Sequence, residues 1–267
     1  MFRGLYTATS GMMSQNRYQQ VLTNNLANAS TPGFKTDDSA VRSFPDQLIK
    51  AQNANQPAPI GHLSTGVYLQ EAIPSFLQGP IRETGNATDF ALLDEKLAAD
   101  PETGERGHLL FAVETADGDV RYTRNGQFTV DAQGFLATSF GQRVLGDDLQ
   151  PLQVGGSEFS ADDSGAITRE DGSVAGNLWI GMTEDAGQLV KQGHNLLAWE
   201  GDPDEAPALA ADGERYTQQG FIEQSNVDLT RTMTDMMTAY RGFESNQKVI
   251  QAYDRSMEKA VNEIGRV

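Results

Sequence analysis

The residues with the greatest capacity for chemistry are three histidines and a few runs of acidic side chains. His62, His108 and His194 are the only histidines, and their spacing matches no metal-binding motif. Clustered carboxylates, which Ca²⁺ prefers as ligands, occur at Asp162-Asp163 and in the run 202–205. Neither run has the ligand spacing of an EF-hand loop. We therefore expect solvated loop carboxylates, with no metal site and no cofactor.

The sequence also lacks the motifs of common enzymes. It contains no P-loop, no dinucleotide-binding glycine motif, no nucleophile elbow and no His-Glu-x-x-His motif. It has no cysteine, which excludes disulfides, thiolate metal ligands and a cysteine nucleophile. A net charge of −17 argues against a protein that binds nucleic acid through clustered Lys and Arg. The carboxylates are too numerous for a catalytic pair to be identified from the sequence, and we predict no catalytic residues.

Charge and glycine content divide the chain into two ends and a centre. Residues 1–36 carry three basic residues and no acidic one, and residues 221–267 have a net charge of −1. Residues 37–220 carry −19 and contain 22 of the 27 glycines. Long helices require few glycines, so this division predicts helical ends around an acidic central domain.

The N-terminal end has the pattern of one helix with a narrow apolar face. Between residues 5 and 29, six of the eight positions spaced alternately three and four residues apart are apolar, as in a short coiled coil, and Gln15 and Gln19 occupy the other two. Thr31-Pro32-Gly33 should end the helix, because proline cannot continue it and glycine accepts left-handed dihedrals. The apolar positions are Leu5, Ala8, Met12, Leu22, Leu26 and Ala29.

The C-terminal end is more regular, with an apolar residue at every seventh position. A weaker companion series includes Met233, Tyr240 and Val261. We predict one helix of about 35 residues, roughly 50 Å long, capped at its start by Ser225 or Asp228. Its apolar face requires a partner, either the N-terminal helix or another subunit. The seven-residue series is Leu229, Met236, Phe243, Ile250, Met257 and Ile264.

The centre has the short runs and turn signals of antiparallel β structure. We expect a hairpin across Asn125-Gly126, a further turn at Gln133-Gly134, and another hairpin within residues 167–180. The run 52–59 has the composition of a linker. The predicted fold class is α+β, with long terminal helices forming a coiled-coil-like stalk and a central, mainly antiparallel β domain.

Three segments closely resemble the signature sequences of bacterial flagellar rod and hook proteins. The first is the run from Asn24 to Lys35, Asn-Asn-Leu-Ala-Asn-Ala-Ser-Thr-Pro-Gly-Phe-Lys. The second, in the centre, is Tyr-Thr-Arg-Asn-Gly-Gln-Phe at 122–128, and the third is Glu-Gln-Ser-Asn-Val-Asp-Leu at 223–229. The chain length is similar to that of the distal rod protein and its close paralogues.

The resemblance implies a structural axial component of the flagellar basal body, not an enzyme, that polymerises through its terminal helices and transmits torque. Expected partners are other copies, other rod and hook proteins, and the flagellar type III export apparatus, with export to the basal body without a Sec signal. It is not expected to be an integral membrane protein or to bind nucleic acid. Alternatives are a hook-type or hook-assembly component and, more remotely, a soluble β-domain binding protein or enzyme.

The resemblance and the apolar patterns together define an expected organisation. Residues 1–36 and 221–267 form the assembly core, 37–75 an extended connector, and 76–220 the β domain. The expected assembly residues lie on the two helices and in the signature segments. They are Leu5, Met12, Leu22, Asn24, Asn25, Leu26, Asn28, Ser225, Asn226, Val227, Leu229, Met236, Phe243, Ile250, Met257 and Ile264.

Overall fold

The computed structural model describes residues 3–50, 59–63, 65–97, 106–211 and 213–264, and it has two compact units. The helical unit comprises Met1–Ala27, Asp37–Ile73 and Asp228–Val267. The β unit comprises Asn28–Thr36 and Pro74–Val227. The α+β class and the mainly antiparallel strands predicted from the sequence are confirmed. The linker predicted at 52–59 lies, up to residue 58, outside the described residues.

The N-terminal helix ends, and the C-terminal helix begins, near the positions predicted from the sequence. Helix α1 (Arg3–Ala27) ends before the Thr31-Pro32-Gly33 turn, where Gly33 has a φ of +67°. Helix α2 (Leu229–Lys259) is 31 residues long and continues as a π-helical turn over Ala260–Ile264. Of the two predicted caps, Asp228 is the N-cap of α2, because its carboxylate accepts a hydrogen bond from the Arg231 N–H at 3.1 Å.

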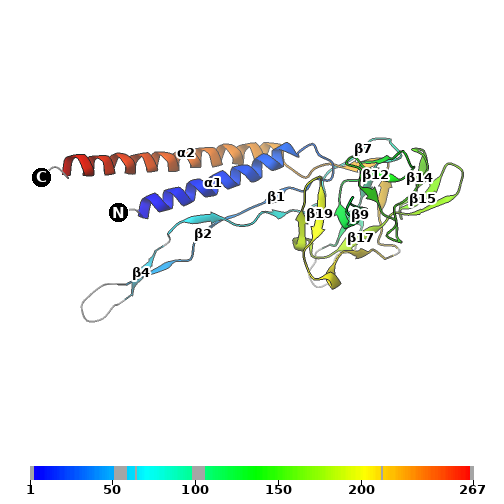
Figure 1. The fold of residues 1–267 in the computed structure, drawn as a ribbon, viewed down its shortest axis with the longest axis horizontal. Coiled ribbons are helices and arrows are strands. Elements are labelled where there is room, and N and C mark those ends of the chain that lie inside the picture. The colour runs from blue at the N-terminus through cyan, green and yellow to red at the C-terminus, as the bar shows by residue number, and fades with distance from the viewer. Residues whose placement is uncertain (1–2, 51–58, 64, 98–105, 212, 265–267) are drawn as a thin grey trace. The chain divides into compact units, whose positions relative to one another are not determined.

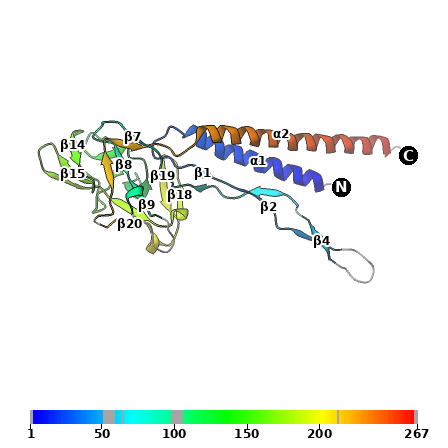
Figure 2. The same cartoon turned by 180° about the vertical axis from the view of Figure 1, so that it is seen from behind.

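The two helices run side by side in opposite directions, as Figures 1 and 2 show. Gly4 of α1 lies against Tyr253 of α2, and Gly11 lies against Asn246. A Cβ atom at Gly11 would lie only 2.9 Å from the Asn246 side-chain nitrogen. The absence of a side chain at these two positions therefore permits the close approach of the helix backbones.

A ribbon of strands follows α1 within the helical unit. Strand β2 (Val41–Ser43) pairs antiparallel with β5 (Val67–Leu69), and the pair Arg42–Tyr68 lies in register. The other edge of β5 is covered by hydroxyl groups of α1. Ser14 Oγ donates to the Val67 carbonyl at 3.1 Å, the Val67 N–H donates to Ser10 Oγ at 3.3 Å, and Thr7 Oγ1 donates to the Thr65 carbonyl at 3.3 Å.

Strand β9 (His108–Glu114) is the centre of the β unit. It pairs antiparallel with β10 (Val120–Thr123) along one edge and with β13 (Arg143–Val144) and β17 (Ile180–Thr183) along the other. All five residues from Leu109 to Val113 are buried, which explains their uninterrupted apolar run. Within the described residues this sheet has nine strands: seven follow the order β11-β12-β13-β9-β10-β19-β18, β17 also pairs with β9, and β20 pairs with β17.

In the main core of the β unit, the ring of Phe128 contacts two other phenylalanine rings. Phe128 lies edge-on to Phe111, with ring centroids 5.2 Å apart, and 6.2 Å from Phe90. Leu136, Ile167 and other aliphatic side chains complete this core. Burial of this apolar surface is the main source of stability of the unit.

The predicted hairpin across Asn125-Gly126 is wrong. Strand β10 pairs with β9 and with β19 (Leu196–Trp199), so neither of its edges is free for β11 (Phe128–Val130). Strand β11 instead pairs with β12 (Leu136–Thr138) across the turn predicted at Gln133-Gly134. The hairpin predicted within 167–180 is confirmed as β15 (Ala166–Arg169) and β16 (Val174–Asn177).

The remaining strands are short, and most belong to two- or three-stranded ribbons of the two units. They are β1 (Asp37–Asp38), β3 (Gln47–Lys50), β4 (Pro59–Leu63), β6 (Ile73–Pro74), β7 (Ile81–Glu83), β8 (Phe90–Leu92), β14 (Phe159–Ala161), β18 (Leu189–Lys191), β20 (Ala208–Leu209), β21 (Thr217–Gln219) and β22 (Phe221–Glu223), with 3-10 turns at Asp94–Lys96, Ala186–Gln188 and Pro203–Glu205.

Candidate assembly interface

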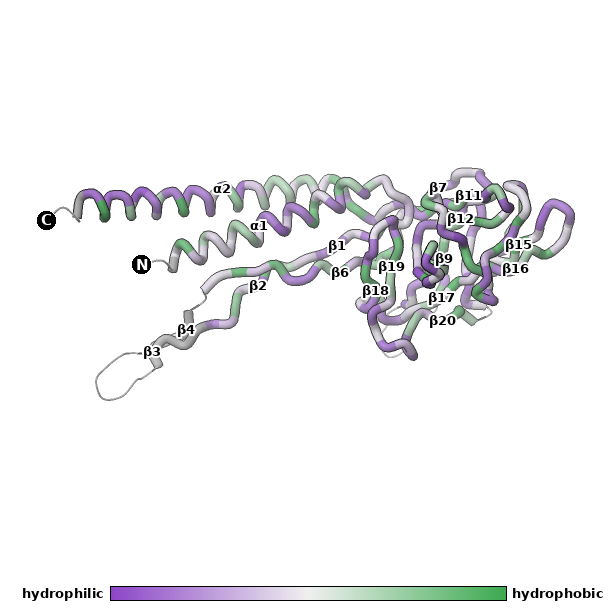
Figure 3. Tube along the Cα trace, in the orientation of Figure 1, coloured by the Kyte–Doolittle hydropathy of each residue, from purple (hydrophilic) through white to green (hydrophobic). Residues whose placement is uncertain are grey.

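The helix pair carries an open apolar groove of about 530 Å³. Met233, Met237 and Tyr240 are each at least half exposed, so a large apolar surface faces solvent along one side of α2. Figure 3 shows hydrophobic segments along both helices. Exposed apolar surface of this kind is typical of a protein-interaction site. The groove is lined by Gln19, Thr23, Leu26, Met233, Met236, Met237, Tyr240 and Arg241.

The predicted apolar series of α1 and α2 differ in exposure along the helix pair. Leu22 is buried, whereas Leu5, Met12, Leu26, Met236, Phe243, Ile250 and Met257 are half-buried. Leu229, at the start of α2, is exposed. Ile264 lies in the π-helical turn that follows α2. The half-buried side chains keep apolar surface available for a further partner.

The signature asparagine Asn25 is engaged within the helical unit. Its side-chain amide forms two hydrogen bonds with the backbone of Asp37, each 3.0 Å long, and it is buried. The Asn25 amide therefore pairs with both the N–H and the carbonyl of Asp37 and fixes the backbone there. Asn24 lies on the exposed side of the helix.

Other signature residues, Asn28 and Ser225 to Val227, form hydrogen bonds within the β unit. The side chain of Asn226 accepts from the Thr36 N–H at 2.7 Å and donates to the carbonyls of Ser75 and Leu77. Buried Ser225 accepts from the N–H of half-buried Val227. Asn28 accepts from the Thr31 hydroxyl at 3.2 Å in the turn after α1. These residues fix the backbone of segments 28–36 and 224–227.

A buried ion network that the sequence analysis missed lies in the same part of the β unit. Glu223 binds Lys35 Nζ at 2.8 Å through one oxygen and Arg124 Nε at 2.5 Å through the other. Arg124 also donates to Asp94 at 2.7 Å and to the Leu109 carbonyl at 2.5 Å. All four charged side chains are at most 9% exposed. The network joins the segments next to both terminal helices to the central strand β9.

The electrostatics of the network follow from burial and from the sharing of carboxylates. Burial and the nearby charge of Arg124 lower the pKa of Lys35 to about 8, although Glu223 opposes the shift. Burial acts to raise the pKa of Asp94, but the charge of Arg124 and hydrogen bonds from His108, Arg124 and the Leu109 N–H outweigh it and lower this pKa to about 2. Burial likewise acts to raise the pKa of Glu223, but Arg124 and Lys35 lower it overall. The network therefore holds both carboxylates ionised at neutral pH.

The acidic runs form turns in the β unit. Asp162 accepts hydrogen bonds from the Ser164 hydroxyl at 2.7 Å and from the Ala166 N–H at 2.9 Å, and Asp202 accepts from the Asp204 N–H at 3.1 Å. Carboxylates in such Asx turns satisfy the backbone of the turn. Within the described residues, no group of three or more His, Asp or Glu side chains is arranged to hold a metal ion.

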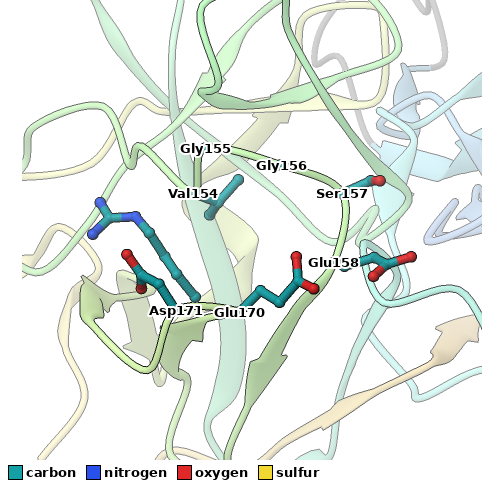
Figure 4. A pocket seen from close by; sticks show the side chains of 8 residues that line it. Val154, Gly155, Gly156, Ser157, Glu158, Glu170 and Asp171 are labelled. Atoms are coloured by element: carbon teal, nitrogen blue, oxygen red, sulfur yellow. The ribbon is translucent and has the colours of Figure 1, made fainter.

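A second cavity, of about 470 Å³, lies in the β unit (Figure 4). Its wall includes the carboxylates of Glu158, Glu170 and Asp171. Asp171 accepts hydrogen bonds from the Ser173 hydroxyl and N–H, which lower its pKa. These bonds stabilise the turn between β15 and β16. The wall combines acidic side chains with the exposed loop 155–158.

Comparison with known families agrees with this arrangement of helices and β unit. The family model "Flagella basal body rod protein" matches residues 5–35, and "Flagellar basal body rod FlgEFG protein C-terminal" matches residues 218–263. Residues 106–168 match "Flagellar hook protein FlgE/F/G D1 domain". The chain belongs to the flagellar basal-body rod and hook family, and it is a structural protein of that family.

The similarity to individual relatives extends over the whole chain. The chain is 40% identical over 273 residues to the flagellar hook-basal body complex protein FlhO of Bacillus subtilis (strain 168), with 100% of both chains covered. It is 30% identical to the flagellar basal-body rod protein FlgF of Caulobacter vibrioides, again over 100% of both chains. Identity to the rod protein FlgG of Bacillus subtilis (strain 168) is 29%, covering 98% of this chain and 99% of that protein.

The structure adds residues to the candidate interface that the predicted series did not include. Thr23, Met237 and Arg241 line the groove although they lie outside the predicted apolar series of the two helices, and Gln19 occupies a polar position of the N-terminal series. The weaker companion series, which contains Met233 and Tyr240, was the signal that pointed to this surface.

In the described part of the chain, no helix is apolar enough over a sufficient length to cross a membrane.

Proposed function

We propose that this chain is an axial component of the rod or rod–hook region of the basal body, and that it polymerises through a coiled-coil core formed by its terminal helices. The observation that carries the proposal is the exposed apolar groove of the helix pair. Burial of this surface against other subunits stabilises an assembly in proportion to the apolar area removed from water, at roughly 25 cal/mol per Å². In the assembled rod, the packed helices transmit torque.

The proposed organisation assigns different roles to the parts of the chain. Residues 1–36 and 221–267 are the assembly core, with the sixteen predicted residues at or near its contacts, and 76–220 is the acidic domain outside it, joined by the connector 37–75. The partners are other copies, other axial flagellar proteins and the type III export apparatus, through which the chain leaves the cytoplasm. The role is structural and not enzymatic.

The test changes the groove without removing either helix. Met233→Glu combined with Met237→Glu places two charges in the groove, and Thr234→Glu combined with Thr238→Glu is the matched control on the same helix. Each full-length variant is expressed in a flagellated host that lacks its own copy of the gene. Isolated basal bodies are then examined for the chain, and cells for motility.

We expect the methionine variant to be exported but absent from basal bodies, with loss of motility, because buried unpaired charges oppose packing. The threonine variant should be incorporated. Circular dichroism of both purified variants checks that the helices still form. Normal incorporation of the methionine variant would contradict assembly through this surface. The secretion route is checked separately: in a host with a defective type III export gate, the unmodified chain should not be exported.

A further inference from the structure

Three of the eight methionines of the chain line the apolar groove of the helix pair. Met233 is 50% exposed and Met237 is 59% exposed, and Met236 is half-buried. Small polar molecules in the solvent therefore reach at least the two exposed side chains. Oxidation to the sulfoxide is a common modification of methionine, and the chain has no cysteine thiol that would compete for the oxidant.

A polar atom in the wall of the same groove has no partner. Gln19 lines the groove, and its side-chain Nε2 is buried and forms no hydrogen bond with the described residues. A buried amide donor without an acceptor is unfavourable. The sulfur of methionine is only a weak acceptor, whereas the oxygen of a sulfoxide is polar and accepts hydrogen bonds. Oxidation inside the groove therefore supplies the kind of acceptor that Gln19 lacks.

We propose that the groove is a methionine oxidation site, at which hydrogen peroxide converts Met233 and Met237 to sulfoxides. In each reaction the sulfur loses two electrons, the O–O bond of the peroxide breaks, and one oxygen atom forms the new S–O bond. The other oxygen leaves as water with both hydrogen atoms of the peroxide. One of the two sulfoxide oxygens accepts a hydrogen bond from Gln19 Nε2.

The consequence for assembly rests on the proposed function, in which other subunits bury the groove. Oxidation changes an apolar side chain into a polar one, and burial of a polar group without a hydrogen-bond partner is unfavourable. Gln19 can serve only one of the two sulfoxides, so the oxidised groove packs less well against an apolar partner. Methionine sulfoxide reductases restore the thioether, which makes the change reversible.

Oxidation of the purified full-length chain by dilute hydrogen peroxide tests the chemistry. Peptide mass spectrometry measures the sulfoxide at each methionine over time. Met233 and Met237 should oxidise roughly fivefold faster than Met182, which is half-buried against the core of the β unit. Met13, which is 56% exposed and does not line the groove, calibrates the rate of an exposed methionine. Rates at Met233 and Met237 no higher than at Met182 overturn the proposal.

NMR of the same samples tests the role of Gln19. Its side-chain amide proton signal should move downfield on oxidation, as that of a newly hydrogen-bonded N–H does. Gln78 is the matched control, because its Nε2 already donates to the Leu92 carbonyl at 3.0 Å in the β unit. A Gln19 signal that shifts no more than that of Gln78 would show that Gln19 is not the donor.

Glutamine substitutions test the consequence for assembly, because glutamine is a polar side chain of similar length to methionine sulfoxide. Full-length Met233→Gln combined with Met237→Gln is expressed in a flagellated host that lacks its own copy of the gene. Thr234→Gln combined with Thr238→Gln is the matched control on the same helix, where both threonines are exposed. We expect several-fold fewer copies of the methionine variant in isolated basal bodies, and normal incorporation of the control.

Normal incorporation of the glutamine variant at Met233 and Met237 overturns the link between oxidation and assembly. If Met233→Glu combined with Met237→Glu is still absent from basal bodies in that case, the proposed function stands and only the effect of oxidation is wrong. Circular dichroism of each purified variant checks that the helices form.

Discussion

Replacing Arg124 by methionine is expected to destabilise the β unit by about 3–5 kcal/mol, the usual cost of removing one partner from a buried ion network. The guanidinium is 1% exposed and donates to two carboxylates and two carbonyls. Methionine has similar length but donates to none of them. Asp94 would keep the Leu109 N–H, and Glu223 would keep Lys35 and the Gly79 N–H.

Lys35→Met should have a smaller effect, about 1–3 kcal/mol. Glu223 retains the Arg124 charge in this variant, so no carboxylate is left without a cation. The loss is confined to the ion pair and to the bonds that Lys35 Nζ donates to the carbonyls of Phe76 and Leu77. The expected order of destabilisation, Arg124→Met above Lys35→Met, follows from the number of acceptors that each side chain serves.

Urea unfolding followed by tryptophan fluorescence measures these changes selectively. The only tryptophans, Trp179 and Trp199, both belong to the β unit. Arg121→Met, on the strand β10 that directly precedes Arg124, is the matched control, because Arg121 is partly exposed and its partner Asp119 is largely exposed. The control should cost no more than about 1 kcal/mol. If Arg124→Met cost no more than Arg121→Met, the reasoning on the buried network would be refuted.

The remaining predictions concern acid stability and one turn. Asp94 has a pKa of about 2 in the folded chain against an ordinary 3.8, so its contribution is complete above about pH 4 and is lost as pH falls toward 2. Over this pH range, the unfolding free energy of Asp94→Asn should therefore fall by about 2 kcal/mol less than that of the unmodified chain. Asp117→Asn, at an exposed site, should not change the fall in this way. Gly33→Ala should cost about 1–3 kcal/mol, because Gly33 has a φ of +67° and a Cβ there would lie 2.5 Å from the Asn125 nitrogen. Gly118→Ala, at an open turn, should cost about 1 kcal/mol. Thermal melts of both glycine variants measure the losses, and equal losses would argue against the steric reasoning.

The helices were predictable because their determinants are local. The seven-residue apolar series, the Asp228 cap and the Pro32-Gly33 stop lie within or next to the helices that they define. The hairpin across Asn125-Gly126 was predicted wrongly because a local turn signal carries no information on distant strands. Strand β19, about 70 residues further along the chain, occupies the edge of β10 that the prediction assigned to β11.

The ion network was beyond the sequence for a similar reason. Lys35 and Glu223 are 188 residues apart, and their sequence neighbourhoods give no sign that they meet. Both lie in segments that resemble the flagellar signatures, so the resemblance marked the positions without revealing their chemistry. The sequence indicates part of the groove, because Met233 and Tyr240, which line it, belong to the weaker apolar series of the C-terminal helix.

The hydroxyl groups of α1 have a consequence for how this chain associates. An open strand edge is a template that any extended segment can join, and such pairing competes with ordered assembly. Ser10 and Ser14 form hydrogen bonds with the N–H and the carbonyl of Val67, which a foreign strand would need for pairing. A helix thus closes one side of a ribbon whose residues would otherwise favour aggregation. In a structural axial protein of the flagellum, these hydroxyls restrict which extended segments can pair with this ribbon.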